Sequence, residues 1–246
     1  MPKRAAGVVK RPKSKNLPKS STLASSVYAR LRQDIISTKL KPGARVTINE
    51  LCDLYKVGLS PAREALNRII SEGLIQLSES RRLQVAPLTA EDLKELLRTR
   101  IWLNEIGLRH SIKNGDAAWE ERLVIACYRL SRIPRYIDGA EPDRNPEWEA
   151  AHRVFHESLI SASNSKWLIG FCQELFDAAE RYRYLARVST VTRPRHQDEH
   201  SQIMQAATAR NADLAVKLLA EHFQRTAELA MRQIHSLKSG GGGKST

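Results

Sequence analysis

The chain has 246 residues, of which 41% are apolar and 27% are charged, and its formal net charge at pH 7 is +13. This composition suits a globular protein of one or two domains. No stretch approaches the roughly 20 apolar residues of a membrane span, and the N-terminus lacks the apolar core of a secretory signal. We therefore expect a cytoplasmic protein without a membrane partner. The three cysteines are far apart, which excludes a disulfide framework and a CxxC metal or redox site.

The positive charge is concentrated at one end of the chain. Residues 1–88 carry 17 basic and 6 acidic side chains, whereas residues 89–246 carry 23 and 21. A basic module joined to a nearly neutral one indicates a polyanionic partner, and nucleic acid is the leading candidate. Residues 1–24 contain seven basic side chains and no acid, so we expect a disordered basic arm. The glycine-rich residues 238–246 are expected to form a flexible tail.

Residues 25–88 begin with two predicted helices. Apolar residues recur at helical spacing from Val27, and this first helix should end before Pro42. Thr47 is followed three residues later by Glu50, which is the spacing of a capping box. A second, short helix is therefore predicted to begin there.

A third helix and a hairpin are predicted next. Ser60 is expected to cap this helix with Pro61 at its first helical position, and Gly73 should end it. Residues 74–77 and 83–86 are predicted to form two short strands around a polar tip. Three helices followed by such a hairpin are the element order of a winged helix-turn-helix DNA-binding domain.

Residues 89–237 show a helical pattern throughout. Six helices are expected, at residues 90–112, 116–135, 145–162, 165–186, 194–209 and 211–236. Amphipathic helices joined mostly by short connections imply an antiparallel bundle. The expected fold class is therefore mostly α, with a winged helix-turn-helix followed by an all-α bundle.

The third helix is a candidate recognition helix, because its polar face carries groups that bind base edges. Arg63 could contact a guanine with two hydrogen bonds, and Asn67 or Ser60 could contact a base or a phosphate. At the predicted wing tip, Arg81 and Arg82 suit the minor groove or the phosphates. The alternative for both regions is an ordinary solvated surface.

The run LRQDIISTKLKPGARVTINELCDLYKVGLSPAREALNRIISEGLIQLSESRRLQVAPLT closely resembles the N-terminal domain of GntR-type bacterial transcription regulators. The resemblance includes the PxREAL motif and the wing that leads into VAPL. It implies DNA contacts from the second helix, the turn before the proline, the motif arginine and the wing tip, at Asn49, Gly58, Leu59, Ser60, Arg63, Arg81 and Arg82. Asn49 replaces the family's arginine, Gly58-Leu59-Ser60 replaces Ser-Arg-Thr, and Arg82 replaces a glycine. The operator should therefore differ from the commonest GntR sites.

Four histidines of the second domain are candidates for a metal site. His152 and His156 lie four residues apart, so they share one helix face with apolar neighbours such as Phe155. His200 and His222 lie on the apolar faces of two later helices. Inward histidines on three helices could form a transition-metal site. Separate, hydrogen-bonded core histidines are the alternative.

Arg100 lies with Asn104 on the inward face of the first bundle helix. A buried guanidinium needs an anionic partner, which could be an acidic ligand or a bundle acid such as Glu149. A mainly solvated basic face is expected, in contrast, for the three arginines of AERYRYLAR: Arg181, Arg183 and Arg187.

The second domain resembles the FCD domain, the ligand-binding bundle of the FadR branch of GntR regulators, in its segments HRVFH, DEHSQI and AEHF. It is also similar to a carbon-starvation-induced regulator of this family. The resemblance implies that the metal ligands are His152, His156, His200 and His222, with His152 in place of the usual acidic residue, and zinc or nickel as the expected ion. It further implies an effector pocket at Arg100, whose usual glutamate companion is here Asn104.

We therefore expect a homodimeric DNA-binding transcription regulator, which in this family is most often a repressor. Its effector would be a small carboxylate bound at a metal-containing site in the bundle. The alternative is a helical metal-dependent hydrolase that uses the histidine cluster. The sequence contains no HExxH helix and places no carboxylate as a base, so we do not expect an enzyme. A structural nucleoid protein would instead bind DNA without sequence preference.

Overall fold

The computed structural model describes residues 23–137, 143–186 and 196–240. The described residues divide into two compact units, one that ends at Gln33 and resumes over Arg45–Val85, and the other formed by Asp34–Ala44 and the described residues from Ala86 onward. In the described part of the chain, no helix has the length and apolar character needed to cross a membrane.

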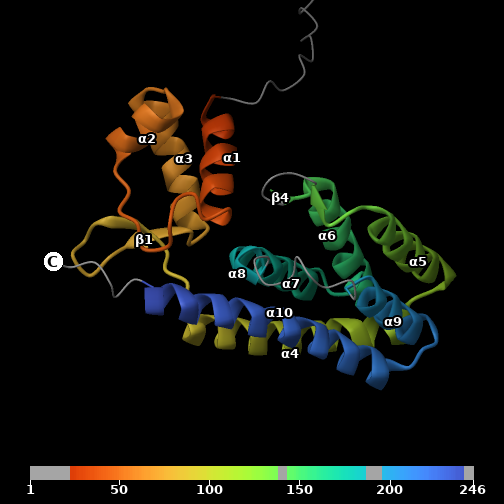
Figure 1. The fold of residues 1–246 in the computed structure, drawn as a ribbon. Helices are drawn as coiled ribbons and strands as arrows, with labels where there is room; N and C mark the ends of the chain where they lie inside the picture. The colour runs from red at the N-terminus through yellow and green to blue at the C-terminus, as the bar shows by residue number, and fades with distance from the viewer. Residues whose placement is uncertain (1–22, 138–142, 187–195, 241–246) are drawn as a thin grey trace, which may run out of the picture. The chain divides into compact units, whose positions relative to one another are not determined.

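The N-terminal part of the chain has the element order expected of a winged helix-turn-helix (Figure 1). Its elements are α1 (Leu23–Ile36), α2 (Ile48–Tyr55), α3 (Leu59–Ser71), β1 (Ile75–Leu77) and β2 (Leu83–Val85). The two strands pair antiparallel, with Ile75 opposite Val85. One face of α3 is fully buried through Ala62, Ala65 and Ile69, which fixes this helix and leaves its polar face to solvent.

The start of α2 is as predicted, whereas the start of α3 is not. The backbone N–H of Glu50 donates to Oγ1 of Thr47 at 3.3 Å, and the backbone N–H of Thr47 donates to the Glu50 carboxylate at 2.9 Å. The expectation that Ser60 caps the third helix is wrong, because α3 begins two residues earlier, at Leu59, with Gly58 as its N-cap. Pro61 still lies in the first turn, where a backbone N–H has no helical acceptor.

The C-terminal part of the chain is a helical bundle. Its helices are α4 (Ala90–Asn114), α5 (Ala117–Arg132), α6 (Pro146–Ile160), α7 (Lys166–Ala178), α8 (Glu180–Ala186), α9 (His196–Thr208) and α10 (Ala212–Gly240). The long helices α4 and α10 lie side by side (Figure 1). Helix α5 packs on α6 and α9, α7 packs on α4, and α8 packs on α10.

Large aromatic side chains lie fully buried in the core of the bundle. Trp119 of α5 and Phe155 of α6 are both fully buried, and the indole N–H of Trp119 donates to the carbonyl of Ser158 at 2.9 Å. This satisfied indole locks α5 against α6. The buried face of α6 also carries two of the four histidines, His152 and His156.

The bundle departs from expectation at two places. The single helix expected over residues 165–186 is two helices, α7 and α8, interrupted at Ala179. No glycine or proline marks this interruption, so the sequence pattern could not show it. The loop before α6 contains a short antiparallel pair, β3 (Tyr136–Ile137) and β4 (Asp143–Arg144), that was not predicted.

Both predicted terminal segments lie largely outside the described residues. Helix α1 begins at Leu23, so the described chain takes in only the last two residues of the predicted basic arm. Helix α10 continues to Gly240, into the segment predicted as a tail. The remaining residues, 1–22 and 241–246, are not described.

Candidate functional site

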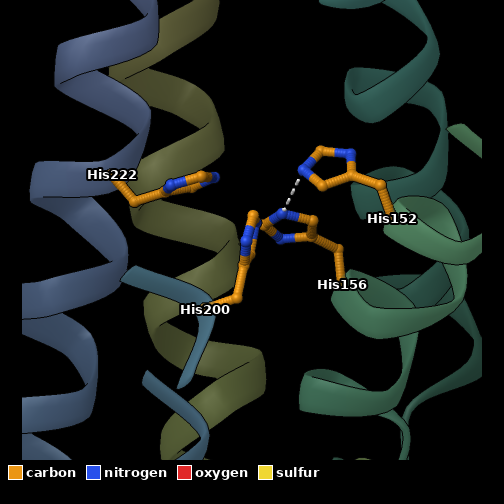
Figure 2. Close-up of side chains that lie close together, drawn as sticks. All are labelled: His152, His156, His200 and His222. Atoms are coloured by element: carbon orange, nitrogen blue, oxygen red, sulfur yellow. Dashed lines mark hydrogen bonds between the residues drawn. The ribbon is translucent and has the colours of Figure 1, made fainter. Parts of the chain in front are cut away.

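Four histidines from three helices meet in the interior of the bundle (Figure 2). His152 and His156 come from α6, His200 from α9 and His222 from α10. Each is at most 5% exposed, and one ring nitrogen of each lies within 4.8 Å of the others. The structure thus brings together all four of the predicted metal ligands.

The cluster has the chemistry that a transition metal requires. Nε2 of His152 lies 3.0 Å from Nε2 of His156, and two imidazole nitrogens bound to one ion at about 2.1 Å lie roughly 3.0 to 3.4 Å apart. Burial, and then the neighbouring rings, lower the pKa of His152 and of His156 well below the usual value, so both are neutral at pH 7. Their Nδ1 atoms are buried without a hydrogen-bond partner. Neutral rings with unsatisfied nitrogens could hold a metal.

Glu199 orients one of the four rings. Nδ1 of His222 donates to Oε2 of Glu199 at 2.8 Å, and the other carboxylate oxygen accepts from Nε of Arg225 at 3.3 Å. A histidine that donates Nδ1–H to a carboxylate presents Nε2 as its lone pair, with raised basicity. Sequence reasoning missed Glu199, although its position directly before His200 was an available signal.

Arg100 is buried beside the histidines without an acidic partner. Its guanidinium carbon lies 4.2 Å from the centroid of the Phe223 ring, and its Nε is buried without a hydrogen-bond partner. Among the described residues Arg100 makes no ion pair. Glu149, which the sequence suggested as a possible partner, therefore does not pair with Arg100. Burial, and then the charge of Arg183, lower the pKa of Arg100 to about 9, so it stays charged at pH 7. The amide of Asn104 donates to the Arg100 carbonyl at 2.9 Å.

The histidines line a narrow hollow in the bundle. Its other lining residues are three arginines, two aromatic residues and a threonine: Arg100, Arg135, Arg183, Trp148, Phe223 and Thr226. An adjoining hollow is lined by Arg100, Asn104, His156 and Glu157 among others. Both predicted effector residues therefore face space beside the cluster.

The solvated basic face expected for the segment AERYRYLAR is wrong for two of its three arginines, Arg181 and Arg183, both of which lie on α8. Arg181 and Arg183 are each only 5% exposed, because α8 packs against α10 in the interior. Arg183 donates to the Phe176 carbonyl at 2.9 Å and lines the histidine hollow. Arg187 lies outside the described residues. Arg135, also missed, was expected to be the last residue of the helix over residues 116–135, but α5 ends at Arg132 and Arg135 lies in the loop that follows.

All eight residues predicted to contact DNA are exposed on the surface of the N-terminal unit. They are Asn49 on α2, Gly58 before α3, Leu59, Ser60, Arg63 and Asn67 on α3, and Arg81 and Arg82 at the hairpin tip. The tip is closed by two backbone hydrogen bonds of 2.8 Å, from Ser78 to Arg82 and from Arg81 to Ser78. Arg81 adopts a left-handed conformation with φ of 57°, so the turn holds this side chain in solvent.

Comparison with known proteins identifies the class. Residues 23–85 match the family of bacterial regulatory proteins, gntR family, and residues 95–225 match the FCD domain. The chain belongs to the GntR family of bacterial regulators. The predicted resemblance to GntR regulators is confirmed for both domains. The predicted fold class, a winged helix-turn-helix followed by an all-α bundle, is confirmed as well.

Relatives of this GntR regulator are transcription regulators. It is 35% identical over 203 residues to the HTH-type transcriptional regulator BphR of Paraburkholderia xenovorans. The matched region covers 82% of this chain and 83% of BphR. It is 26% identical to the HTH-type transcriptional repressor GlaR of Escherichia coli, over 79% of this chain and 90% of GlaR. A solved GntR-family regulator from Pseudomonas syringae matches with a TM-score of 0.54 and 25% identity, over 89% of each chain. The chain is therefore a DNA-binding transcription regulator and not an enzyme.

Proposed function

We propose that this GntR regulator is a homodimeric repressor whose affinity for its operator is changed by a small organic acid bound at a metal in the FCD domain. The observation that carries the proposal is Arg100, a buried guanidinium with an unpartnered Nε in the wall of a hollow that four histidines also line. A buried charge without compensation is costly, so an anionic ligand is the fitting partner. Repression is supported by the likeness to GlaR.

The metal would be held by His152, His156, His200 and His222. An all-imidazole set suits zinc or nickel and disfavours magnesium or calcium. When bound, the ion would supply a Lewis-acidic site for a carboxylate oxygen of the effector. Because none of these four ligands is anionic, the ligand set itself would leave the charge of the ion unneutralised, which favours an anion at the site.

We assign operator recognition to the exposed face of α3 and to the wing. Arg63, Asn67 and Ser60 would contact bases or phosphates in the major groove. The backbone around Gly58, together with Leu59 and Asn49, would contact the neighbouring phosphates or bases, and the wing tip with Arg81 and Arg82 would reach the minor groove or the phosphates. A two-fold symmetric dimer would read a palindrome.

Helix α8 offers a route from the effector hollow to the DNA-binding domain. Arg183 lines the hollow, Arg181 binds the segment that joins β2 to α4, and Tyr182 binds the first turn of α4. Nη2 of Arg181 donates to the Ala86 carbonyl at 2.6 Å, and the hydroxyl of Tyr182 donates to the Asp92 carboxylate at 2.5 Å. An effector that repositions α8 would alter these bonds, so it would bind two states of the protein with different free energies, as regulation requires.

Replacing Tyr182 by phenylalanine tests this route, because the variant keeps the buried ring and loses only the hydroxyl. We expect the effector to bind Tyr182→Phe as it binds the wild type, while the effector-induced change in operator affinity falls about fivefold or more. Thermal shift measures the first quantity and fluorescence anisotropy with labelled operator the second. Tyr128→Phe is the control, since Tyr128 is 65% exposed on α5. An unchanged response in Tyr182→Phe would rule the route out.

The central experiment is a screen of organic acids against the zinc-loaded protein, by thermal shift and then by operator binding. We expect an acid that raises the melting temperature and changes operator affinity, and we expect Arg100→Met to bind it about tenfold or more weakly. Methionine removes a desolvated charge and keeps an unbranched chain, so the fold should persist. Failure of every acid to stabilise the protein, or an acid that binds Arg100→Met equally well, would contradict the proposal.

A further inference from the structure

An exposed leucine lies at the start of the candidate recognition helix. Leu59 is the first residue of α3 and is 52% exposed, although leucine is among the residues most often buried in proteins. The space beside it is open, because a Cβ added at Gly58 would meet no atom of the described residues within 4 Å. The Leu59 side chain is therefore accessible to a partner that binds this end of α3.

Leu59 lies on the same row of side chains as two residues assigned to operator recognition. Arg63 follows it by four residues and Asn67 by eight, and all three are exposed. Residues four apart on a helix are neighbours, about 6 Å apart along the helix axis. Base pairs stack about 3.4 Å apart, so a duplex that contacts Arg63 presents a base to Leu59 within about two steps.

The end of α3 that carries Leu59 is also the end that recognition helices place against base edges. Gly58 caps α3 without a side-chain hydrogen bond, so no capping side chain covers this end. The first backbone N–H groups of a helix lack helical acceptors and favour a phosphate. With a phosphate at those groups, the Leu59 side chain would lie beside the bases that follow it.

The chemistry of the leucine side chain limits which base it can select. The isobutyl group neither donates nor accepts a hydrogen bond, so it cannot recognise the polar edges of guanine, adenine or cytosine. Thymine presents an apolar group in the major groove, its C5 methyl. Contact between this methyl and leucine removes apolar surface of both from water, whereas a polar edge against leucine loses its hydration without compensation.

We propose that Leu59 selects a thymine in each half-site of the operator by contact with the C5 methyl group. This inference rests on the proposed operator recognition by α3 and adds the base that the start of the helix reads. The thymine should lie within about two base pairs of the base bound by Arg63. Leu59 would thus determine specificity through an apolar contact, without charge or hydrogen bonding.

The first experiment compares the sequences that two forms of the full-length protein select from a library of random duplexes. We expect the wild type to select one thymine per half-site whose preference is lost in Leu59→Ala, while the other positions keep theirs. In the second experiment, deoxyuridine replaces that thymidine, which removes only the methyl group from the duplex. Wild-type affinity, measured by fluorescence anisotropy, should fall about fourfold per half-site, the value of one buried methyl group.

The Leu59→Ala variant tests whether the methyl group acts through this side chain. We expect it to bind the thymidine and deoxyuridine duplexes with affinities within about twofold of each other, because the two changes remove the same contact. Its salt dependence should equal that of the wild type, since leucine neutralises no phosphate. Leu214→Ala is the matched control, because Leu214 is a 43% exposed leucine of α10 in the bundle. This control should discriminate the two duplexes as the wild type does.

The outcomes separate this inference from the proposed function. Equal binding of the wild type to both duplexes would overturn it, and so would full discrimination in Leu59→Ala or a selected operator without such a thymine. Each of these results would leave operator recognition by Arg63 standing. Failure of the wild type to select any sequence would count against the proposed function itself. The comparison of the two duplexes needs only the wild type, so it is decisive even if a variant does not fold.

Discussion

Replacement of His156 by alanine should remove most of the metal from the purified protein. His156 contributes one of only four clustered ring nitrogens, and its Nε2 lies 3.0 Å from that of His152. Loss of a supporting residue around a metal already costs about 10 to 100-fold in affinity, and loss of a ligand should cost at least that much. We expect up to one equivalent of zinc or nickel per chain in the wild type and less than about a tenth of that in His156→Ala. Elemental analysis after dialysis measures both.

The matched control is His110→Ala, because His110 is an exposed histidine of α4 outside the cluster. Its metal content should equal that of the wild type. The wild type should keep its metal as the pH falls through the ordinary imidazole range and lose it only at lower pH, because a metal ligand must be a neutral imidazole and burial lowers the pKa of His152 and His156 well below the usual value. Equal metal content in His156→Ala and the wild type would show that these histidines form a core without a bound ion.

The part of this site that the sequence could predict is the part that follows helical spacing. His152 and His156 are four residues apart, so they had to lie on one face of α6, and the apolar neighbours of that face placed them inward. The convergence of His200 and His222 on the same point depends on how three helices pack. Spacing alone left this open, and the likeness to the FCD domain supplied it. The close approach of all four rings is the structural result.

The arginines show where sequence reasoning fails. Arg100 follows the period of α4, and its inward position was predicted. The position of Arg183 depends on the interruption at Ala179, which no turn residue marks, and Arg135 lies in a loop whose path depends on the β3–β4 pair. Two of the three positive groups in the hollow are therefore set by tertiary structure that local pattern does not encode.

The helix-turn-helix was predictable because local signals agree with tertiary burial. The capping box of α2, the buried stripe of α3 and the hairpin with its polar tip each point to the same element order. The start of α3 is the exception, since Gly58 caps it without a side-chain hydrogen bond and Ser60 lies within the helix. The Ser60 hydroxyl therefore does not cap the helix. Because Ser60 is also exposed, its hydroxyl stays available for DNA.

Replacement of Arg63 by alanine should weaken binding to the operator by about 1 to 3 kcal/mol, which is roughly 5- to 150-fold. Arg63 lies in the second turn of α3 on its exposed face, and the buried Ala62 and Ala65 hold the helix from behind. Within the described part of the chain Arg63 makes no hydrogen bond or ion pair, so its loss should leave the fold unchanged. Fluorescence anisotropy with the mapped operator and with a random duplex of equal length measures both affinities.

The loss of affinity for the operator, compared with the loss for the random duplex, shows whether Arg63 contacts a base or a phosphate. A guanidinium that makes two hydrogen bonds to a guanine contributes to the operator alone, whereas a guanidinium that binds a phosphate contributes equally to every sequence and to the salt dependence. We therefore expect the random duplex to lose less than about twofold in Arg63→Ala, and the control Arg129→Ala to change neither affinity. Equal losses on both duplexes would make Arg63 a phosphate contact. Hydrogen bonds to the bases would then have to come from Ser60 and Asn67, because Leu59 replaces the arginine usual in the family and offers no hydrogen bond.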